Sequence, residues 1–317
     1  MENFWKTLKK PIIGLAPMDG VTDEPMRQIQ CSIVKPSVLY TEFVSVEGFA
    51  RKPEAFQKTL FFQENERPII VQLFGYTPEL FYEAISQMKE MNFDGIDINM
   101  GCPAKSVLQR GGGGALIGNY DLAGRIIEKS LEAIKESKKE ISLSVKTRIG
   151  KDKIITREWI SFLCQFPISE ITVHGRLLKE GNSGEVNWEK IKVAGEIAHN
   201  KEIVCLGNGG IKSFSEARQK TNNFGLDGVL IGQAALGNPW FFKENYVPVK
   251  EEILQTIIGH SRLVNDFYPP ERFATVLKHL GWYPKGFPNC IKLKVELLKC
   301  KNLNQVIETV KKFKEDY

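Results

Sequence analysis

The chain has few histidines and no paired-cysteine motif, with four His and six Cys among its 317 residues. Because no two cysteines form a CxxC pair and no histidine-rich cluster accompanies them, a zinc ribbon or zinc finger is not expected. The spacing also gives no disulfide framework of the kind that small secreted proteins need. We therefore expect a reduced, cytoplasmic protein with no structural zinc and no metal in its site.

Long apolar runs are also missing. The first residues, MENFWKTLKK, lack the apolar segment of a secretory signal peptide, and no apolar stretch of the sequence is long enough to span a bilayer. The net charge is only +5, which permits a polyanionic partner without requiring one. With 42% hydrophobic residues the chain can still bury a sizeable core, so we expect a folded protein without a membrane partner.

Short apolar, β-branched runs recur at regular intervals, and each is bounded by turn residues as a strand buried on both faces would be. Helical patterns, with apolar residues spaced by three and four, lie between most of them, for example at 77–92, 120–139 and 156–166. Eight strand–helix units predict an α/β fold, a (β/α)8 TIM barrel, with a doubly wound open sheet as the alternative. The predicted strands are 11–18, 37–44, 68–75, 95–100, 141–150, 170–176, 202–210 and 227–234.

The pattern changes after about residue 245, where strands give way to amphipathic helical segments at 251–267, 271–280 and 289–316. From residue 251 on, 11 Lys and Arg stand against 8 Asp and Glu, a net +3 of the total +5. We therefore expect a barrel domain at 1–244 and a small helical domain at 245–317. On charge alone, a solvated basic face and a nucleic-acid-binding surface fit this second domain equally well.

Polar residues and glycines follow the apolar runs. In a barrel the carboxyl ends of all strands share one rim, and active sites are built there. We therefore expect these residues to converge on one mouth: Pro17, Met18, Asp19, Glu42, Gln72, Asn99, Lys146, His174, Asn208, Gly209, Gly210, Gly232 and Gln233.

Two glycine-rich turns predict a phosphate site on this rim. They are GNGG (207–210) after the seventh strand and IGQAALGNP (231–239) after the eighth, where barrels often hold a phosphate. Glycines let backbone N–H groups face an anion, and a following helix adds the partial positive charge of its N-terminus. Ser213 is the expected N-cap of that helix.

Three further rim residues favour a flavin. A cation such as Lys146 would stabilise the negative charge of a reduced flavin, while Gln72 and His174 could bond to its ring. An amide, a cation and an imidazole beside a phosphate site indicate flavin mononucleotide (FMN) rather than a sugar phosphate.

Seven motifs in order along the chain resemble the tRNA-dihydrouridine synthase family, in its bacterial branch. The resemblance implies an FMN-binding barrel, a helical tRNA-binding domain, and NADPH-driven reduction of uridine to 5,6-dihydrouridine in tRNA. The motifs are APMDGVTD (16–23), INMGCP (98–103), VKTRIG (145–150), VHGR (173–176), GNGGI (207–211), IGQAALGNPW (231–240) and KHLGWYPKG (278–286).

The resemblance also implies roles for single residues. The family's proton donor falls on Cys102. Its flavin contacts fall on Pro17, Met18, Asp19, Gln72, Lys146 and His174, and its phosphate contacts on Asn208, Gly209, Gly210, Gly232 and Gln233. The candidate substrate-binding residues are Asn99, Arg176, Lys278 and Lys285.

The sequence departs from the family pattern in three places. Gln233 stands where arginine is usual, which removes a charge near the expected phosphate. Leu177 and Asn182 replace a common threonine and a common aromatic residue. The run GGGG at 111–114 is richer in glycine than usual, and we interpret it as a hinge that closes the Cys102 loop over tRNA.

The expected chemistry needs an acid at Cys102. Hydride from N5 of reduced flavin would add to C6 of a flipped-out uracil, and an acid must then protonate C5. A free thiol has a pKa of about 8.5 and is mostly protonated at neutral pH. We interpret the other cysteines considered, Cys31, Cys164, Cys205 and Cys290, as small buried hydrophobic residues.

Two alternatives remain open at this point. One is a small-molecule flavoenzyme of the dihydroorotate dehydrogenase kind, which shares the barrel and the pyrimidine chemistry but needs no basic helical domain. The other is a tRNA-binding protein without catalysis, for which Gln233 is the only indication. We expect the protein to be a monomer.

Overall fold

The computed structural model describes residues 4–136 and 140–316, which divide into two compact units. The barrel unit comprises the chain up to Thr22 together with Ser37–Gly232. The helical unit comprises Asp23–Pro36 and the chain from Gln233 on. Each unit has its own hydrophobic core.

The barrel unit is built on one sheet of parallel strands in the order β1-β9-β8-β7-β6-β5-β4-β2, with β3 also paired to β4. Between β1 and β2, Leu15 N–H donates to Val38 O at 3.1 Å and Ser37 N–H donates to Ile13 O at 2.9 Å, so the sheet closes. The predicted (β/α)8 barrel is confirmed. The strands are β1 (Ile12–Leu15), β2 (Leu39–Tyr40), β3 (Val44–Ser45), β4 (Ile69–Phe74), β5 (Gly95–Met100), β6 (Ser142–Arg148), β7 (Glu170–His174), β8 (Val204–Asn208) and β9 (Gly228–Ile231).

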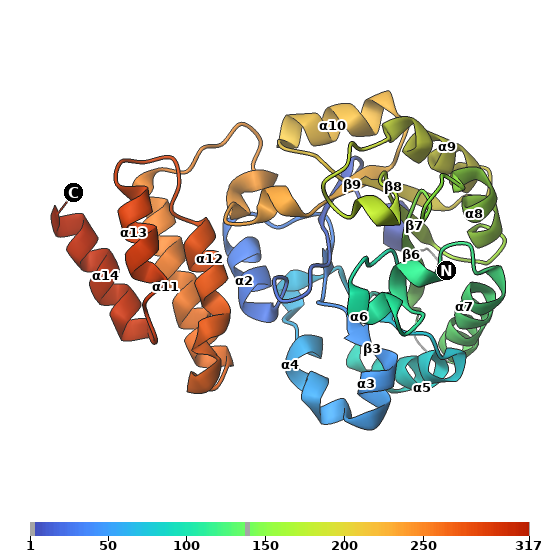
Figure 1. Ribbon diagram of the computed structural model, residues 1–317, viewed down its shortest axis with the longest axis horizontal. Helices are drawn as coiled ribbons and strands as arrows, with labels where there is room; N and C mark the ends of the chain where they lie inside the picture. Colours follow the sequence, from blue (N-terminus) through green and yellow to red (C-terminus); the bar gives the residue numbers. More distant parts are fainter. Residues whose placement is uncertain (1–3, 137–139, 317) are drawn as a thin grey trace. The chain divides into compact units, whose positions relative to one another are not determined.

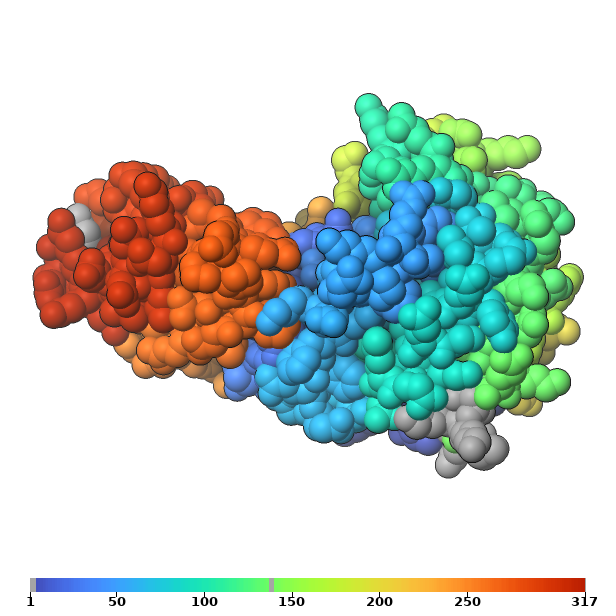
Figure 2. Space-filling model, turned by 90° about the horizontal axis from the view of Figure 1, so that it is seen from below, coloured from blue at the N-terminus to red at the C-terminus, as the bar shows by residue number. Residues whose placement is uncertain are grey.

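Helices surround this sheet, as Figure 1 shows for α5 (Pro78–Met88), α7 (Tyr120–Lys135), α8 (Thr156–Leu163), α9 (Trp188–His199) and α10 (Phe214–Asn223). Segments around α3 and α5, blue to cyan, form much of the barrel unit's surface in Figure 2. The shorter helices of this unit are α1 (Phe4–Thr7), α3 (Val46–Arg51), η1 (Pro53–Phe56), α4 (Gln57–Leu60), η2 (Glu64–Glu66), η3 (Lys89–Met91), α6 (Lys105–Leu108), η4 (Gly113–Leu116) and η5 (Leu178–Glu180).

Two expected elements differ in extent. The run at 37–44 forms two strands of two residues each, because the chain leaves the ladder between Tyr40 and Val44. The helix expected at 120–139 ends at Lys135, and residues 137–139 lie outside the described part of the chain.

The barrel interior is apolar on one side and polar on the other. The apolar cluster comes from β1, β2, β4, β8 and β9, and Trp5 of α1 belongs to it. On β4, Ile70 joins this cluster, and Gln72, two residues further on, faces the same way because side chains alternate along a strand. From there the polar residues continue around the interior as Gln72, Asp97, Ser144, Lys146, Glu170 and Thr172.

The helical unit packs its helices around one apolar core, and α11–α14 are drawn in orange and red in Figure 1. No helix in the described part of the chain is long and apolar enough to cross a membrane. The elements are α2 (Glu24–Ile33), η6 (Gln233–Ala235), η7 (Pro239–Phe242), α11 (Lys250–Phe267), η8 (Pro270–Val276), α12 (Leu277–Trp282), α13 (Cys290–Leu297) and α14 (Leu303–Asp316).

The expected boundary after residue 244 differs from this division. Trp240 lies in the core of the helical unit, so the chain joins that unit from Gln233 on. Helix α2 belongs there as well, because Ile33 packs against the same core and Gln30 donates to Pro239 O at 2.7 Å. The segment 289–316, expected as one helix, is divided at residues 298–302 into α13 and α14.

Candidate active site

Cys102 lies just beyond the end of β5, in a turn held by Asn99. The Asn99 Oδ1 atom accepts from Gly101 N–H at 3.1 Å and from Cys102 N–H at 2.9 Å. The thiol is free and half-buried, and burial raises its pKa above the usual value. Cys102 is therefore protonated at neutral pH and able to donate a proton.

The four glycines at 111–114 pack directly behind this cysteine. A Cβ at Gly112 would lie 2.9 Å from Gly75 O, and one at Gly113, where φ is +56°, would lie 3.1 Å from the Cys102 Cβ. Gly114 N–H donates to Cys102 O at 3.1 Å. Gly112–114 are buried, so the hinge interpretation is replaced by a packing requirement: larger residues would push the Cys102 turn away.

A chain of buried hydrogen bonds holds the side chain of Asn99 in place. Asn99 Nδ2 donates to Gln72 Oε1 at 3.0 Å, and Gln72 Nε2 donates to Asp97 Oδ2 at 2.7 Å. Ser144 Oγ donates to the other oxygen of Asp97 at 2.7 Å. Burial raises the pKa of Asp97 to about 6. Gln72 thus orients Asn99, and it keeps one amide hydrogen and one lone pair for a ligand.

Lys146, near the end of β6, is the expected rim cation. Its Nζ donates to Asn208 Oδ1 at 3.1 Å, and Asn208 Nδ2 donates to Leu230 O at 2.8 Å. Burial and the neighbouring Arg148 lower the pKa of Lys146 to about 8. The ammonium group is therefore mostly charged at neutral pH, but it loses its proton more readily than an ordinary lysine.

His174, the last residue of β7, is a neutral hydrogen-bonding group. The Nη1 atom of Arg176 lies 3.1 Å from His174 Nε2. Since arginine can only donate, Nε2 accepts and the proton sits on Nδ1. Burial and three nearby cations hold the pKa of His174 well below its usual range.

Arg176, a predicted substrate-binding residue, lies two residues after the end of β7. Its side chain is buried, and besides His174 it donates to Gly184 O. A Cβ at Gly210 would lie 3.7 Å from Arg176 Nη2, so the guanidinium group lies beside the glycine turn after β8. Arg176 therefore faces the expected phosphate site.

Arg148 is a rim residue for which we predicted no role. It is buried, and its Nε donates to Gly101 O at 2.7 Å while Nη1 donates to Gly181 O at 2.6 Å. It thereby joins the Cys102 turn to the loop after β7. Its position two residues after Lys146, on the same face of β6, is the signal that could have identified it.

The turn after β8 contains two glycines with positive φ. Gly209 and Gly210 have φ of +120° and +71°, and a Cβ at Gly209 would lie 2.8 Å from His174 Cδ2. Ser213 caps α10 as predicted, because its side chain accepts from Glu216 N–H at 3.1 Å. Glycine is thus required where the backbone turns toward the rim.

The remaining rim residues lie on the loop after β1 and at the end of β9. Pro17 and Met18 are half-buried and Asp19 is exposed. A Cβ at Gly232 would lie 3.7 Å from Met18 Sδ, which brings these two strand ends together. Gln233 is exposed and is the first residue of the helical unit.

Two expected substrate-binding residues belong to the helical unit. Lys278 in α12 is half-buried, and Lys285 is exposed with its Nζ donating to Leu236 O at 3.4 Å. Of the cysteines expected to be buried, Cys164 and Cys205 are, whereas Cys31 and Cys290 are only half-buried, so that part of the prediction was wrong.

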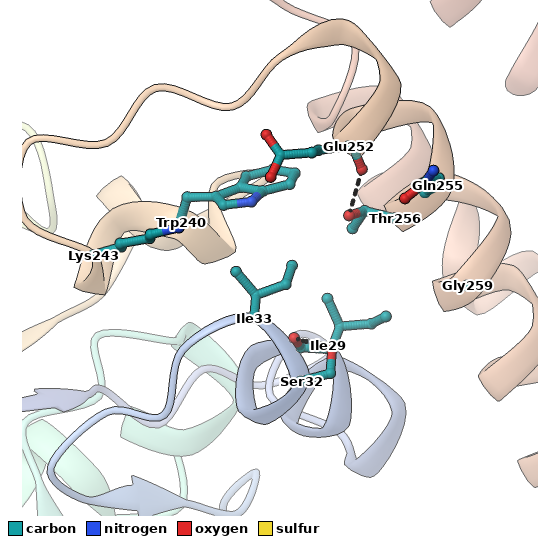
Figure 3. Close-up of a pocket in the computed structure, with 9 residues that line it drawn as sticks. All are labelled: Ile29, Ser32, Ile33, Trp240, Lys243, Glu252, Gln255, Thr256 and Gly259. Carbon is teal, nitrogen blue, oxygen red and sulfur yellow. Dashed lines mark hydrogen bonds between the residues drawn. The ribbon is translucent and has the colours of Figure 1, made fainter.

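The helical unit also contains a pocket of about 370 Å³ between α2, η7 and α11 (Figure 3). Its carboxylate, Glu252, accepts from Val249 N–H at 2.9 Å and from the Tyr246 hydroxyl. Thr256 Oγ1 donates to the Glu252 carbonyl at 2.8 Å, the dashed line in Figure 3. Because these polar groups already bond within the unit, the barrel rim is the better candidate for chemistry.

The fold and the rim together define a (β/α)8-barrel enzyme with a free cysteine and buried cationic side chains at the carboxyl ends of its strands. A family model described as dihydrouridine synthase (Dus) matches residues 14–317, and the chain belongs to that family. Membership makes the protein a flavin-dependent oxidoreductase, as the motifs led us to expect.

Individual relatives agree with this placement. A probable tRNA-dihydrouridine synthase of Staphylococcus aureus is 31% identical over 313 residues, covering 95% of this chain and 93% of the relative. A probable tRNA-dihydrouridine synthase 2 of Bacillus subtilis is 28% identical over 326 residues, covering 100% of this chain and 98% of the relative. Among solved structures, an old yellow enzyme homologue from Zymomonas mobilis has a TM-score of 0.53 at 15% identity over 76% of this chain and 91% of that chain, a likeness of fold.

Proposed function

We propose that the protein is an FMN-dependent tRNA-dihydrouridine synthase that reduces the C5–C6 double bond of uridines in tRNA with electrons from NADPH. The observation that carries the proposal is a free, half-buried cysteine, Cys102, on a rim lined by cations, where burial raises the pKa of the thiol. The family description and the names of the curated relatives point to the same reaction. The protein acts as a monomer in the cytoplasm, where tRNA is found.

The cations of the rim fit FMN. Lys146, Arg148 and Arg176 all lie near His174 and offer the positive charge that the phosphate and a reduced flavin would require. When bound, FMN supplies the hydride that C6 of uracil accepts. The proposed flavin contacts are Pro17, Met18, Asp19, Gln72, Lys146 and His174.

The glycine turns fit the phosphate of FMN. Gly209 and Gly210 both have positive φ, which favours glycine in this turn. Gly232 has open space beside it, because the nearest atom to an added Cβ is Met18 Sδ at 3.7 Å. Backbone N–H groups in such turns bind anions. The proposed phosphate contacts are Asn208, Gly209, Gly210, Gly232 and Gln233.

Arg176 supports phosphate binding where Gln233 brings no charge. Its guanidinium group lies beside Gly210 and is held in place by its bonds to His174 and to Gly184 O. A guanidinium group suits phosphate because its N–H groups form a planar fork. We therefore assign to Arg176 the charge that the family usually carries at position 233.

Cys102 supplies the proton for C5 of uracil. Because burial keeps its pKa high, the thiol stays protonated until the carbanion forms. Asn99, through its two bonds to the turn, sets the direction of the sulfur. Asn99 is therefore a positioning residue in addition to its proposed place near the substrate.

The helical unit contributes basic residues for the tRNA backbone. Its last 67 residues, 251–317, carry a net charge of +3, and Lys278 and Lys285 are the proposed phosphate contacts. Binding through phosphates predicts an affinity for tRNA that falls steeply with salt and depends little on sequence.

Removing the Asn99 amide should slow the reaction without releasing the flavin. We expect Asn99→Ala to lower kcat by about 10²-fold, because a displacement of about 1 Å at the acid has that effect. The flavin spectrum should stay the same. Asn99→Asp, which still accepts from both N–H groups of the turn, should recover part of the rate. Full kcat in Asn99→Ala would contradict the positioning role.

The function itself is tested in cells and with purified protein. Cells lacking the protein should lack dihydrouridine at specific tRNA positions, and the purified protein should restore it in their tRNA with NADPH. Reduction of free pyrimidines but not of tRNA would instead indicate a small-molecule flavoenzyme. A colourless protein that binds tRNA without reducing it would indicate a binding protein.

A further inference from the structure

Three potential metal ligands meet inside the helical unit, far from one another in the sequence. Asp23 is the N-cap of α2, His260 lies in α11 and His279 in α12. Their exposed fractions are 7%, 0% and 2%, and one ligand atom from each lies within 4.8 Å of the other two. The chain brings half of its four histidines to this point.

Both imidazoles have an unpartnered nitrogen. Within the part of the chain that the structure describes, His260 Nε2 and His279 Nε2 are buried and form no hydrogen bond. Buried polar atoms in native proteins are nearly always paired, and an exception requires an explanation such as an ion. Two such atoms beside a buried carboxylate point to one shared ligand.

The surroundings of His260 are those of a metal-binding histidine. Its Nδ1 atom lies 2.8 Å from the buried Tyr283 hydroxyl, which fixes the plane of the ring. Ligating histidines typically bond through their second nitrogen in this way.

Asp23 has lone pairs left for an ion. One oxygen accepts from Met26 N–H at 3.2 Å and the other from the Tyr268 hydroxyl at 3.3 Å. Each carboxylate oxygen has two acceptor sites, so capping α2 and binding a metal are compatible. Arg27 lies near Asp23 and Lys278 lies near all three side chains, and both positive charges oppose the binding of any cation.

We propose that Asp23, His260 and His279 bind one Zn²⁺ ion that ties the start of α2 to α11 and α12. Two imidazole nitrogens and one carboxylate are ligands that Zn²⁺ prefers. Because the site is closed to solvent, the ion is structural. The ion would add to the contacts of Ile33 and Gln30 that hold Asp23–Pro36 in the helical unit.

The test is metal content together with thermal stability of the full-length protein. Protein purified without chelators should contain about one Zn²⁺ per chain by elemental analysis, as a single site requires. Chelation should lower Tm, and added Zn²⁺ should restore it. His279→Gln should abolish both the bound zinc and the response of Tm, whereas the control His199→Gln, in α9 of the barrel unit, should keep both.

A second measurement uses the wild-type protein and therefore does not depend on whether His279→Gln folds. Co²⁺ added to chelated wild-type protein should produce the visible absorption of a nitrogen- and oxygen-ligated site, and Zn²⁺ should remove it. Lys278→Met should strengthen Zn²⁺ binding by removing the opposing charge. Protein without bound metal and with a Tm indifferent to Zn²⁺ and Co²⁺ would overturn the proposal, and would indicate a buried water molecule between the three side chains.

Discussion

Cys102→Ala should lose uridine reduction by about 10²- to 10⁴-fold, the range that a positioned acid contributes. The variant should stay yellow, because the proposed flavin contacts come from the other strand ends and alanine fits the space of the thiol. Its flavin should still be reduced by NADPH at the wild-type rate. The measurement is the rate of dihydrouridine formation in unmodified tRNA alongside the rate of flavin reduction.

Cys290→Ala is the matched control for this experiment. Cys290 is also free and half-buried, but it lies in α13 of the helical unit. We expect this variant to keep the wild-type rate. Equal turnover in Cys102→Ala and Cys290→Ala would remove Cys102 from the mechanism.

Lys146→Met should impair the step that forms reduced flavin. A methionine fills the space of the lysine stem but cannot stabilise the negative charge of reduced flavin, which should slow reduction by about 10²- to 10³-fold. We also expect weaker FMN binding. The measurements are the rate of flavin reduction by NADPH under anaerobic conditions and the dissociation constant of FMN.

The pKa of Lys146 makes this prediction pH-dependent. Since burial lowers that pKa to about 8, the side chain loses its charge as pH rises through that value. The FMN affinity of the wild-type protein should therefore fall above about pH 8, and Lys146→Met should not show this fall. Lys192→Met, an exposed lysine of α9, serves as the control. A Lys146→Met variant with wild-type reduction and the wild-type pH profile would contradict the role.

The barrel and its rim could be predicted because local rules determine them. A parallel strand covered on both faces needs an apolar run, and the polar residues that end each run must meet at one edge of the barrel. The position of Cys102 after β5 and the N-cap at Ser213 follow from such short-range patterns. The Asn99 bonds to the turn are equally local, since asparagine commonly accepts from N–H groups two and three residues on.

Long-range packing could not be predicted in the same way. The sequence of α2 does not show that Gln30 bonds to Pro239, more than 200 residues further on. We therefore predicted that this segment belongs to the barrel domain. The glycines at 111–114 resembled a hinge because the neighbours that require them, Gly75 and Leu178, are distant in the chain. Asp23, His260 and His279 are separated for the same reason, and no spacing motif links them.

The most direct test of the account is a single turnover without oxygen. Protein whose flavin has been reduced with NADPH, and then freed of excess NADPH, is mixed with tRNA that lacks dihydrouridine. We predict that the flavin is oxidised and that about one dihydrouridine forms for each flavin oxidised, since one hydride reduces one double bond. A flavin that stays reduced in the presence of this tRNA, or one that is oxidised without forming dihydrouridine, would contradict it.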